Sequence, residues 1–97
     1  MIPQEKYILR NKELVWRMLD NEAFIMSTDG NKIHSLNNLG SFIWQLLDGK
    51  NSFKNIIRRL CERFKVTEDV AQSDANDFVE KLLAQGLVQL CDTPLAE

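Results

Sequence analysis

Residue types that carry chemistry are scarce in this 97-residue chain. It has one histidine, His34, and two cysteines, Cys61 and Cys91, without a C-x-x-C pair. A catalytic Ser-His or Cys-His pair would have to use His34, yet no G-x-S-x-G or comparable nucleophile motif is present. A zinc site would need three scattered ligands without paired spacing. The sequence therefore predicts no catalytic residue, no metal site and no cofactor, and two reduced thiols rather than a disulfide.

Long apolar runs are also absent. No stretch approaches the roughly 18 residues that a membrane-spanning helix needs, and the start MIPQEKYILRNKE lacks the apolar stretch and cleavage site of a signal peptide. The four glycines fall at expected turns or helix boundaries, and none forms a phosphate-binding loop. We therefore expect a cytoplasmic protein that does not contact a membrane.

The strongest positive signal is a change in hydrophobic period near residue 37. Short apolar runs come first and predict three strands, at residues 14–19, 23–28 and 32–36. Turn-forming residues separate them, Asp20-Asn21-Glu22 and then Asp29-Gly30, where φ > 0 is expected at both central positions. From Leu39 onward the apolar residues recur at helical spacing. A small sheet is thus followed by helices.

Each predicted helix begins at a polar capping residue and carries one apolar stripe. The capping residues are Asn37 or Asn38, then Ser52, then Thr67. Gly49 and Gly86 are expected to end the first and third helices in the left-handed conformation. Three helices of moderate length, each with one buried face, follow from this pattern.

Together these elements predict one domain, residues 1–97, of the α+β class. Its winged helix-turn-helix-like layout has a three-stranded N-terminal antiparallel sheet, three helices and a short C-terminal strand at residues 87–90. Residues 1–12 are expected to form a loose arm and residues 91–97 a tail. The third strand, residues 32–36, is an open sheet edge unless the C-terminal strand pairs there.

The net charge of −2 hides opposite charges on the last two helices. Five basic residues and one acidic residue lie between positions 52 and 65, whereas five acidic residues and one basic residue lie between 67 and 85. Either both faces are simply solvated, or one of them selects a charged partner. A winged helix-turn-helix would place its third helix in DNA, and here that helix is acidic. Nucleic acid is not expected as a partner, and a winged-helix DNA-binding regulator is the alternative function.

A set of core and capping residues from Glu13 to Val88 spans about four-fifths of the chain. It comprises LVWRMLDNEAFIMST, Leu36-Asn37, Gly40, Ile43, Trp44, Leu47-Asp48-Gly49, Ile56, Ile57, Phe64-Lys65-Val66, Asp74, Phe78, Leu82 and Gly86-Leu87-Val88. In order and spacing, this set resembles the PqqD-like superfamily, also called RiPP recognition elements. Many of those relatives carry an aromatic residue where this chain has His34.

The resemblance implies a domain that binds the leader of a ribosomally made precursor peptide and presents it to a modifying enzyme, often a radical SAM protein, or to a leader peptidase. In that family the leader adds a strand to the edge of the third strand and packs against the third helix. An open edge fits this mechanism, because its unpaired N–H and C=O groups can bind an extended peptide.

Eleven residues form the predicted peptide site on these two elements. They are Lys32, Ile33, His34, Ser35 and Leu36 on the strand, and Val70, Ser73, Asp74, Asp77, Phe78 and Lys81 on the helix. The alternative for the helix residues is that the apolar ones belong to the core and the acidic ones to a solvated face. A subunit without a peptide ligand is a third hypothesis for the whole chain.

Overall fold

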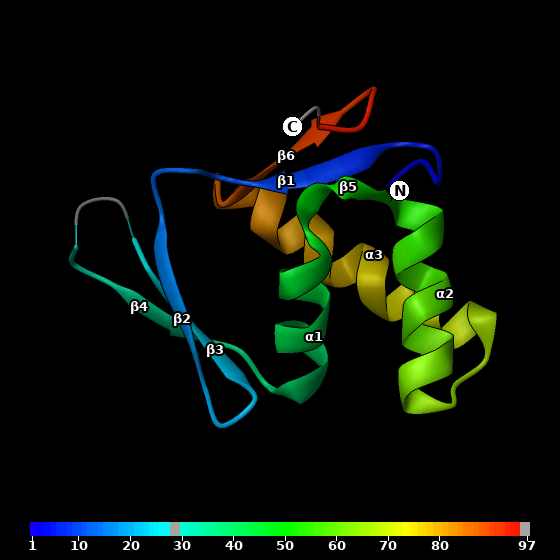
Figure 1. Ribbon diagram of the computed structural model, residues 1–97, viewed down its shortest axis with the longest axis horizontal. Coiled ribbons are helices and arrows are strands. Elements are labelled where there is room, and N and C mark those ends of the chain that lie inside the picture. Colours follow the sequence, from blue (N-terminus) through cyan, green and yellow to red (C-terminus); the bar gives the residue numbers. More distant parts are fainter. Residues whose placement is uncertain (28–29, 96–97) are drawn as a thin grey trace.

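The computed structural model describes residues 1–27 and 30–95. Within these residues, two small antiparallel sheets pack with three helices (Figure 1). The elements follow in the order β1 (Tyr7–Arg10), β2 (Val15–Leu19), β3 (Glu22–Met26), β4 (Ile33–Ser35), α1 (Asn38–Leu46), β5 (Asp48–Ser52), α2 (Phe53–Phe64), α3 (Glu68–Ala84) and β6 (Val88–Cys91). The predicted α+β class, with a three-stranded meander before three helices and a C-terminal strand, is confirmed.

Strands β2, β3 and β4 form the sheet that we call the wing sheet, with β4 at one edge. Asp20 and Asn21 join β2 to β3, with φ of 51° and 69°. Two successive residues at φ > 0 make the tight turn whose twist matches a hairpin, and Asp and Asn tolerate that conformation. At the second predicted turn Gly30 also has a positive φ, 74°, whereas Asp29 lies outside the described residues.

The second sheet, which we call the base sheet, corrects the expected N-terminal arm. Residues of β1 form its central strand, between β5 and β6, and Ile8 is completely buried. Both partner strands lie far away in sequence, so no local pattern could show that residues 7–10 would pair. Because β6 pairs with β1 and not with β4, no strand of residues 1–27 and 30–95 covers the β4 edge of the wing sheet. Cys91, expected in the tail, is the last residue of β6.

The helix caps are those predicted, with one exception at the end of α1. The side chains of Asn37, Ser52 and Thr67 each accept a hydrogen bond from a backbone N–H in the first turn. Gly49, however, does not end α1, whose C-cap is Leu47. It lies inside β5 with a φ of 80°, and an added Cβ there would lie 3.1 Å from a side-chain carbon of Leu9. The polar segment of β5 becomes a strand because it pairs with β1, and at the close approach to Leu9 only glycine fits.

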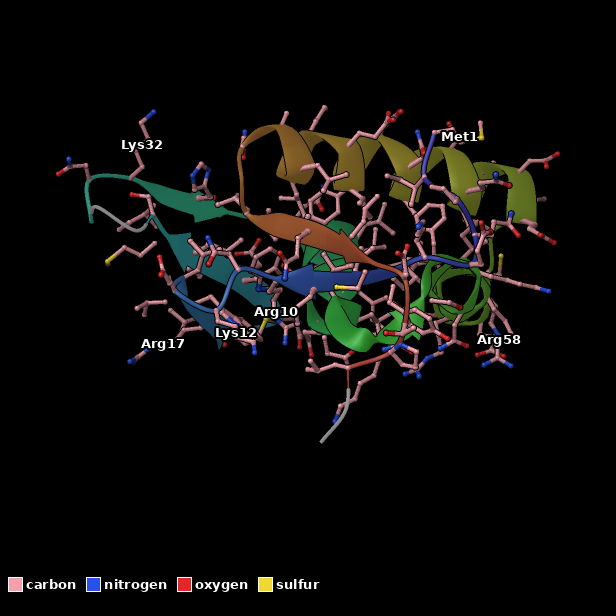
Figure 2. The ribbon with its side chains drawn as sticks, turned by 90° about the horizontal axis from the view of Figure 1, so that it is seen from above. Met1, Arg10, Lys12, Arg17, Lys32 and Arg58 are labelled. Atoms are coloured by element: carbon pink, nitrogen blue, oxygen red, sulfur yellow. The ribbon has the colours of Figure 1, made fainter. Side chains whose placement is uncertain are left out.

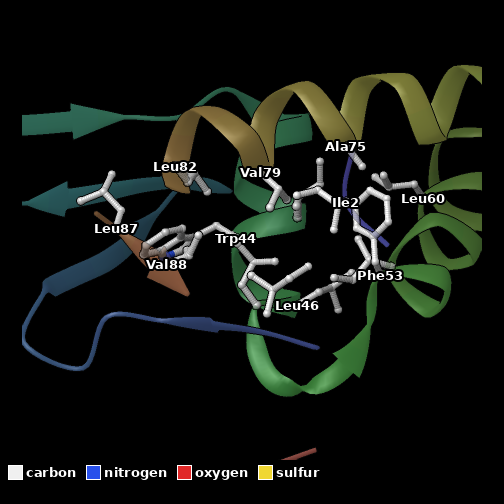
Figure 3. Packing of buried hydrophobic residues seen from close by; sticks show 14 of the residues in the cluster. Ile2, Trp44, Leu46, Phe53, Leu60, Ala75, Val79, Leu82, Leu87 and Val88 are labelled. Atoms are coloured by element: carbon white, nitrogen blue, oxygen red, sulfur yellow. The ribbon is translucent and has the colours of Figure 1, made fainter. Parts of the chain in front are cut away.

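The hydrophobic core lies between α3, α1 and the base sheet (Figure 3). Trp44, Phe53 and Val79 come from three different helices and are completely buried in it. The N-terminal segment closes one side, since Ile2 is buried and its N–H donates to Asn76 Oδ1 over 2.7 Å. This core holds α3 in a fixed position relative to α1, the helix that directly follows β4.

Arg10 connects the two sheets to the end of α1. Its guanidinium lies 4.8 Å from the ring centroid of Trp16, in the wing sheet, and 5.9 Å from that of Trp44. It also donates to the carbonyl oxygens of Trp44 and Gln45, at 2.6 and 3.1 Å, at the C-terminal end of α1. The arginine thereby sets the position of the wing sheet relative to the helices.

Candidate functional site

The hydrogen bonds between β4 and β3 alternate along the strand. Just beyond one end, the Leu36 N–H donates to the Ala23 carbonyl oxygen over 2.9 Å, and beyond the other end the Ser27 N–H donates to the Lys32 carbonyl oxygen over 2.9 Å. Bonded and non-bonded pairs alternate in an antiparallel ladder. The residue midway between positions 32 and 36, His34, therefore also directs its N–H and C=O toward β3.

Ile33 and Ser35 consequently direct their N–H and C=O groups away from β3. On that side, no strand of residues 1–27 or 30–95 pairs with β4. The edge presents two donors and two acceptors in the plane of the sheet, at the spacing that an added strand requires. This open edge is the centre of the candidate site.

Side chains along β4 alternate between two faces of the wing sheet. His34 is opposite Ile25, which is completely buried, so the imidazole lies on the inner face. Ile33 is opposite Met26, and their exposed fractions of 66% and 39% place both on the outer face. Ser35 shares that outer face. A strand added to this edge would thus contact two chemically different surfaces.

A cleft of about 320 Å³ adjoins the inner face of β4. It is lined by Asn11, Leu14, Ser27, Lys32, His34, Gln85, Gly86 and Leu87. These residues come from the β1–β2 connection, the edge of the wing sheet and the turn between α3 and β6. Figure 2 shows β4, with Lys32 at its beginning, on the same side of the molecule as the C-terminal end of α3. An open strand edge and a concave surface thus meet at one place.

The predicted residues of α3 are not gathered at this cleft, and none of the six is among its described lining residues. Phe78 packs toward the start of α1, since an added Cβ on Gly40 would lie 3.2 Å from its ring. At 100° per residue, Asp77 points away from the buried stripe that contains Ala75. The other four, Val70, Ser73, Asp74 and Lys81, are exposed along the helix. The strand part of the predicted site is therefore compact and the helix part is spread over several turns.

Sequence reasoning missed the cleft residues outside β4. Asn11 lies in the segment expected to be a loose arm. Gln85 precedes Gly86, the expected end of the third helix, and nothing in its sequence context indicates a binding role. The Asn11 N–H donates to the Leu87 carbonyl oxygen over 2.9 Å, which ties the β1–β2 connection to the α3–β6 turn. No local sequence pattern signals such a contact, because it depends on the pairing of β1 with β6.

Charged groups near the site are mostly exposed. Burial lowers the pKa of the Arg10 guanidinium, and Asp48 partly opposes this effect. On the far side of the base sheet, Lys6 and Asp92 form an exposed ion pair. The hydrogen bond from Lys6, and to a smaller extent its positive charge, lowers the pKa of Asp92. The same pair raises the pKa of Lys6.

The opposite charges of α2 and α3 are exposed to solvent. In the described residues, no ion pair joins the two helices.

Other parts of the described chain offer less. A larger hollow, about 510 Å³, lies where β5 ends and α2 begins, and its lining combines Lys54 and Arg58 with Cys61 and Glu68. Because Glu68 lies with the two basic side chains, this hollow does not favour a ligand of one charge. Both cysteines are free, as predicted. No three His, Cys, Asp or Glu side chains of residues 1–27 and 30–95 are placed to hold a metal ion. No helix of this part is long and apolar enough to cross a membrane.

Comparison with known proteins identifies the family. The model of the family "Coenzyme PQQ synthesis protein D (PqqD)" matches residues 22–88, more than half of the chain. The chain belongs to the PqqD family. The match runs from the start of β3 to the start of β6, so it includes β4 and the whole of α3. No curated protein sequence matches this PqqD family member significantly.

Two solved structures share the fold of this PqqD family member. One is "TbiB1 in Complex with the TbiA(beta) Leader Peptide", with a TM-score of 0.76 at 22% identity, covering 84% of this chain and 94% of that one. The other is "Lasso peptide synthetase B1 complexed with the leader peptide", with a TM-score of 0.73 at 22% identity, covering 84% and 96%. The similarity extends over most of each chain, and both of these proteins bind a leader peptide.

Proposed function

We propose that this PqqD family protein binds the leader segment of a ribosomally made precursor peptide and presents the precursor to a modifying enzyme, such as a radical SAM protein or a leader peptidase. The observation that carries the proposal is the open edge of β4 beside the inner cleft. Ile33 and Ser35 offer outward N–H and C=O groups, which is what an extended peptide needs in order to add a strand. The two solved structures described above share this fold and are complexes with a leader peptide.

The leader would lie along residues 32–36, antiparallel or parallel to β4. Its main chain would bind Ile33 and Ser35, and its side chains would alternate between the inner cleft, beside Lys32 and His34, and the outer face. Leu36 packs against the core and would close the inner face at the end of the strand. In this arrangement main-chain bonds supply affinity, and the two faces supply specificity.

The α3 residues would contact only the part of the leader that continues past the end of β4. In Figure 2, β4 points toward α1, and α3 extends from its C-terminal end near β4 to its N-terminal end at the far side of the molecule. A peptide that follows this direction would pass Lys81 first, then Phe78, Asp77, Asp74 and Ser73, and finally Val70. The exposure of most of these residues is compatible with such a path.

DNA binding is the weaker alternative. The helix that would enter a groove, α3, begins with Glu68 and Asp69 and carries Lys81 as its only basic residue. Phosphate contacts require Lys and Arg on the docking surface. Four basic residues, Lys54, Arg58, Arg59 and Arg63, are instead on α2, where all four are exposed. The acidic helix therefore favours a peptide over a nucleic acid.

Fluorescence anisotropy can compare the two ligands directly. Synthetic leader segments of short reading frames next to the gene would be titrated with the protein at near-physiological salt, with duplex DNA as the second ligand. We expect one leader to bind at micromolar concentration and DNA to bind only weakly. Tight, salt-dependent DNA binding, with no response to any of the leaders, would contradict the proposal.

A further inference from the structure

The two faces of β4 differ in chemistry in a way that bears on the sequence of the bound peptide. The inner cleft contains Lys32 and His34 as its basic side chains, and none of its described lining residues is Asp or Glu. Gln85 adds an amide group to the same cleft, whereas the Asn11 side-chain amide already donates to the Gly86 carbonyl oxygen over 3.4 Å. A carboxylate that enters it would meet an ammonium group and N–H donors, whereas an ammonium group would meet Lys32 at close range.

The floor of the cleft is apolar. Leu14 and Leu87 line it, and both are almost completely buried. A methylene stem can pack on these side chains while its charged end reaches the rim, as long charged side chains do elsewhere. Glutamate has such a stem, and a volume of about 320 Å³ leaves room for it.

The outer face is apolar where the inner one is charged. Val15, Met26 and Ile33 form one row across the three strands of the wing sheet, with exposed fractions of 62%, 39% and 66%. Exposed apolar side chains that gather in this way mark an interaction surface. The row ends at Ile33 on the open edge, so a residue of an added strand would extend it by one position.

We infer that the chain recognises a leader strand in which an acidic residue, preferably glutamate, faces the inner cleft and the neighbouring residue, which faces outward beside Ile33, is aliphatic or aromatic. This inference rests on the proposed function, because it requires strand addition at β4. It goes beyond that function by assigning a chemical class to two adjacent leader positions. Specificity then comes from the alternation of side chains rather than from a single pocket.

Selection from a displayed library of random peptides tests the inference without knowledge of the natural leader. Peptides about six residues long, the usual length of a strand, would be selected on the whole protein and counter-selected on Ser35→Pro, which blocks the edge. Selection would then be repeated on Lys32→Glu and Ile33→Ser. Lys54→Glu, a charge reversal on α2 away from β4, is the matched control.

Selected peptides should alternate acidic and apolar residues. A matched pair that differs only by Glu or Lys at the inner position should differ in Kd by about two- to fivefold on the original protein, the range of exposed charge pairs. Lys32→Glu should remove or reverse that preference and keep the apolar one, Ile33→Ser should do the opposite, and Lys54→Glu should change neither.

Two other results would overturn the inference, and they differ in what they say about the proposed function. Peptides that depend on the β4 edge but show no alternation, or that prefer lysine at the inner position, would contradict the assigned chemistry and leave strand addition intact. A library with no peptide whose binding depends on the edge would contradict both the inference and the proposed function.

Discussion

Replacing His34 or Ser35 by proline separates the two directions of the β4 backbone. Proline has no N–H and cannot donate in a ladder. The His34 N–H points toward β3, whereas the Ser35 N–H points to the open edge, because bonded pairs alternate from Leu36 to Lys32. The two substitutions are adjacent in the chain, yet one should damage the fold and the other only the binding of an added strand.

His34→Pro should be strongly destabilising. It removes one ladder hydrogen bond and leaves the carbonyl of the buried Ile25 without its partner, which together cost about 2–4 kcal/mol. For a domain of this size, 1 kcal/mol corresponds to about 4–8 °C in Tm. Thermal unfolding followed by circular dichroism should therefore show a Tm lower by at least about 8 °C, whereas His34→Ala, which retains the N–H, should lose much less.

Ser35→Pro should change Tm little, since Ser35 is exposed and its N–H has no partner strand in the described chain. Its affinity for the leader should fall at least about fivefold, because the leader loses a main-chain hydrogen bond and keeps an unpaired carbonyl. Ser35→Ala retains the N–H and should bind normally. A Ser35→Pro variant that is stable and binds the leader as tightly as the original protein would refute strand addition at this edge.

Three further predictions concern the framework that positions the site. Arg10→Met should lower the free energy of unfolding by about 1–3 kcal/mol in a denaturant titration, since it removes two hydrogen bonds and the contacts with both tryptophans; an unchanged midpoint would show that Arg10 does not connect the sheets. Gly49→Ala should lower the free energy of unfolding by about 1–3 kcal/mol, because the new residue has a φ of 80° and its Cβ also lies 3.1 Å from its neighbours. Gly30→Ala, where no atom lies within 4 Å, should lower the free energy of unfolding by less. Equal losses would rule out the close approach at Gly49. Because the Lys6 ammonium lowers the pKa of Asp92, their pair stabilises the fold above the ordinary carboxyl range and is lost as the pH falls through the lowered pKa; Asp92→Asn should therefore flatten the acid side of the stability curve, and an unchanged curve would contradict this.

The wing sheet and the helices could be predicted from sequence because their signals are local. Asp20-Asn21 between two apolar runs predicts a hairpin, and a capping residue such as Ser52 or Thr67 before an apolar stripe predicts where a helix begins. The same local signals identified residues 32–36 as an open edge. The strand part of the candidate site could therefore be predicted from sequence.

The base sheet could not be predicted, and neither could the cleft beside β4, which depends on it. Residues of β1 pair with segments about 40 and 80 positions away, and β5, with the sequence DGKNS, has none of the residues that favour strands. Only tertiary pairing makes these segments strands. The cleft beside β4 also needs Asn11 and Gln85, which this pairing brings together, so its shape could not be predicted from sequence.

Amide hydrogen exchange at β4 tests the central claim most directly. The exchange rates of the Ile33, His34 and Ser35 amides would be measured by NMR for the free protein and for the protein saturated with its leader. The account predicts that Ile33 and Ser35 exchange rapidly in the free protein and slow down strongly with the leader, whereas His34 is protected in both states. Saturation with the leader while the Ile33 and Ser35 amides still exchange at their free rates would contradict it.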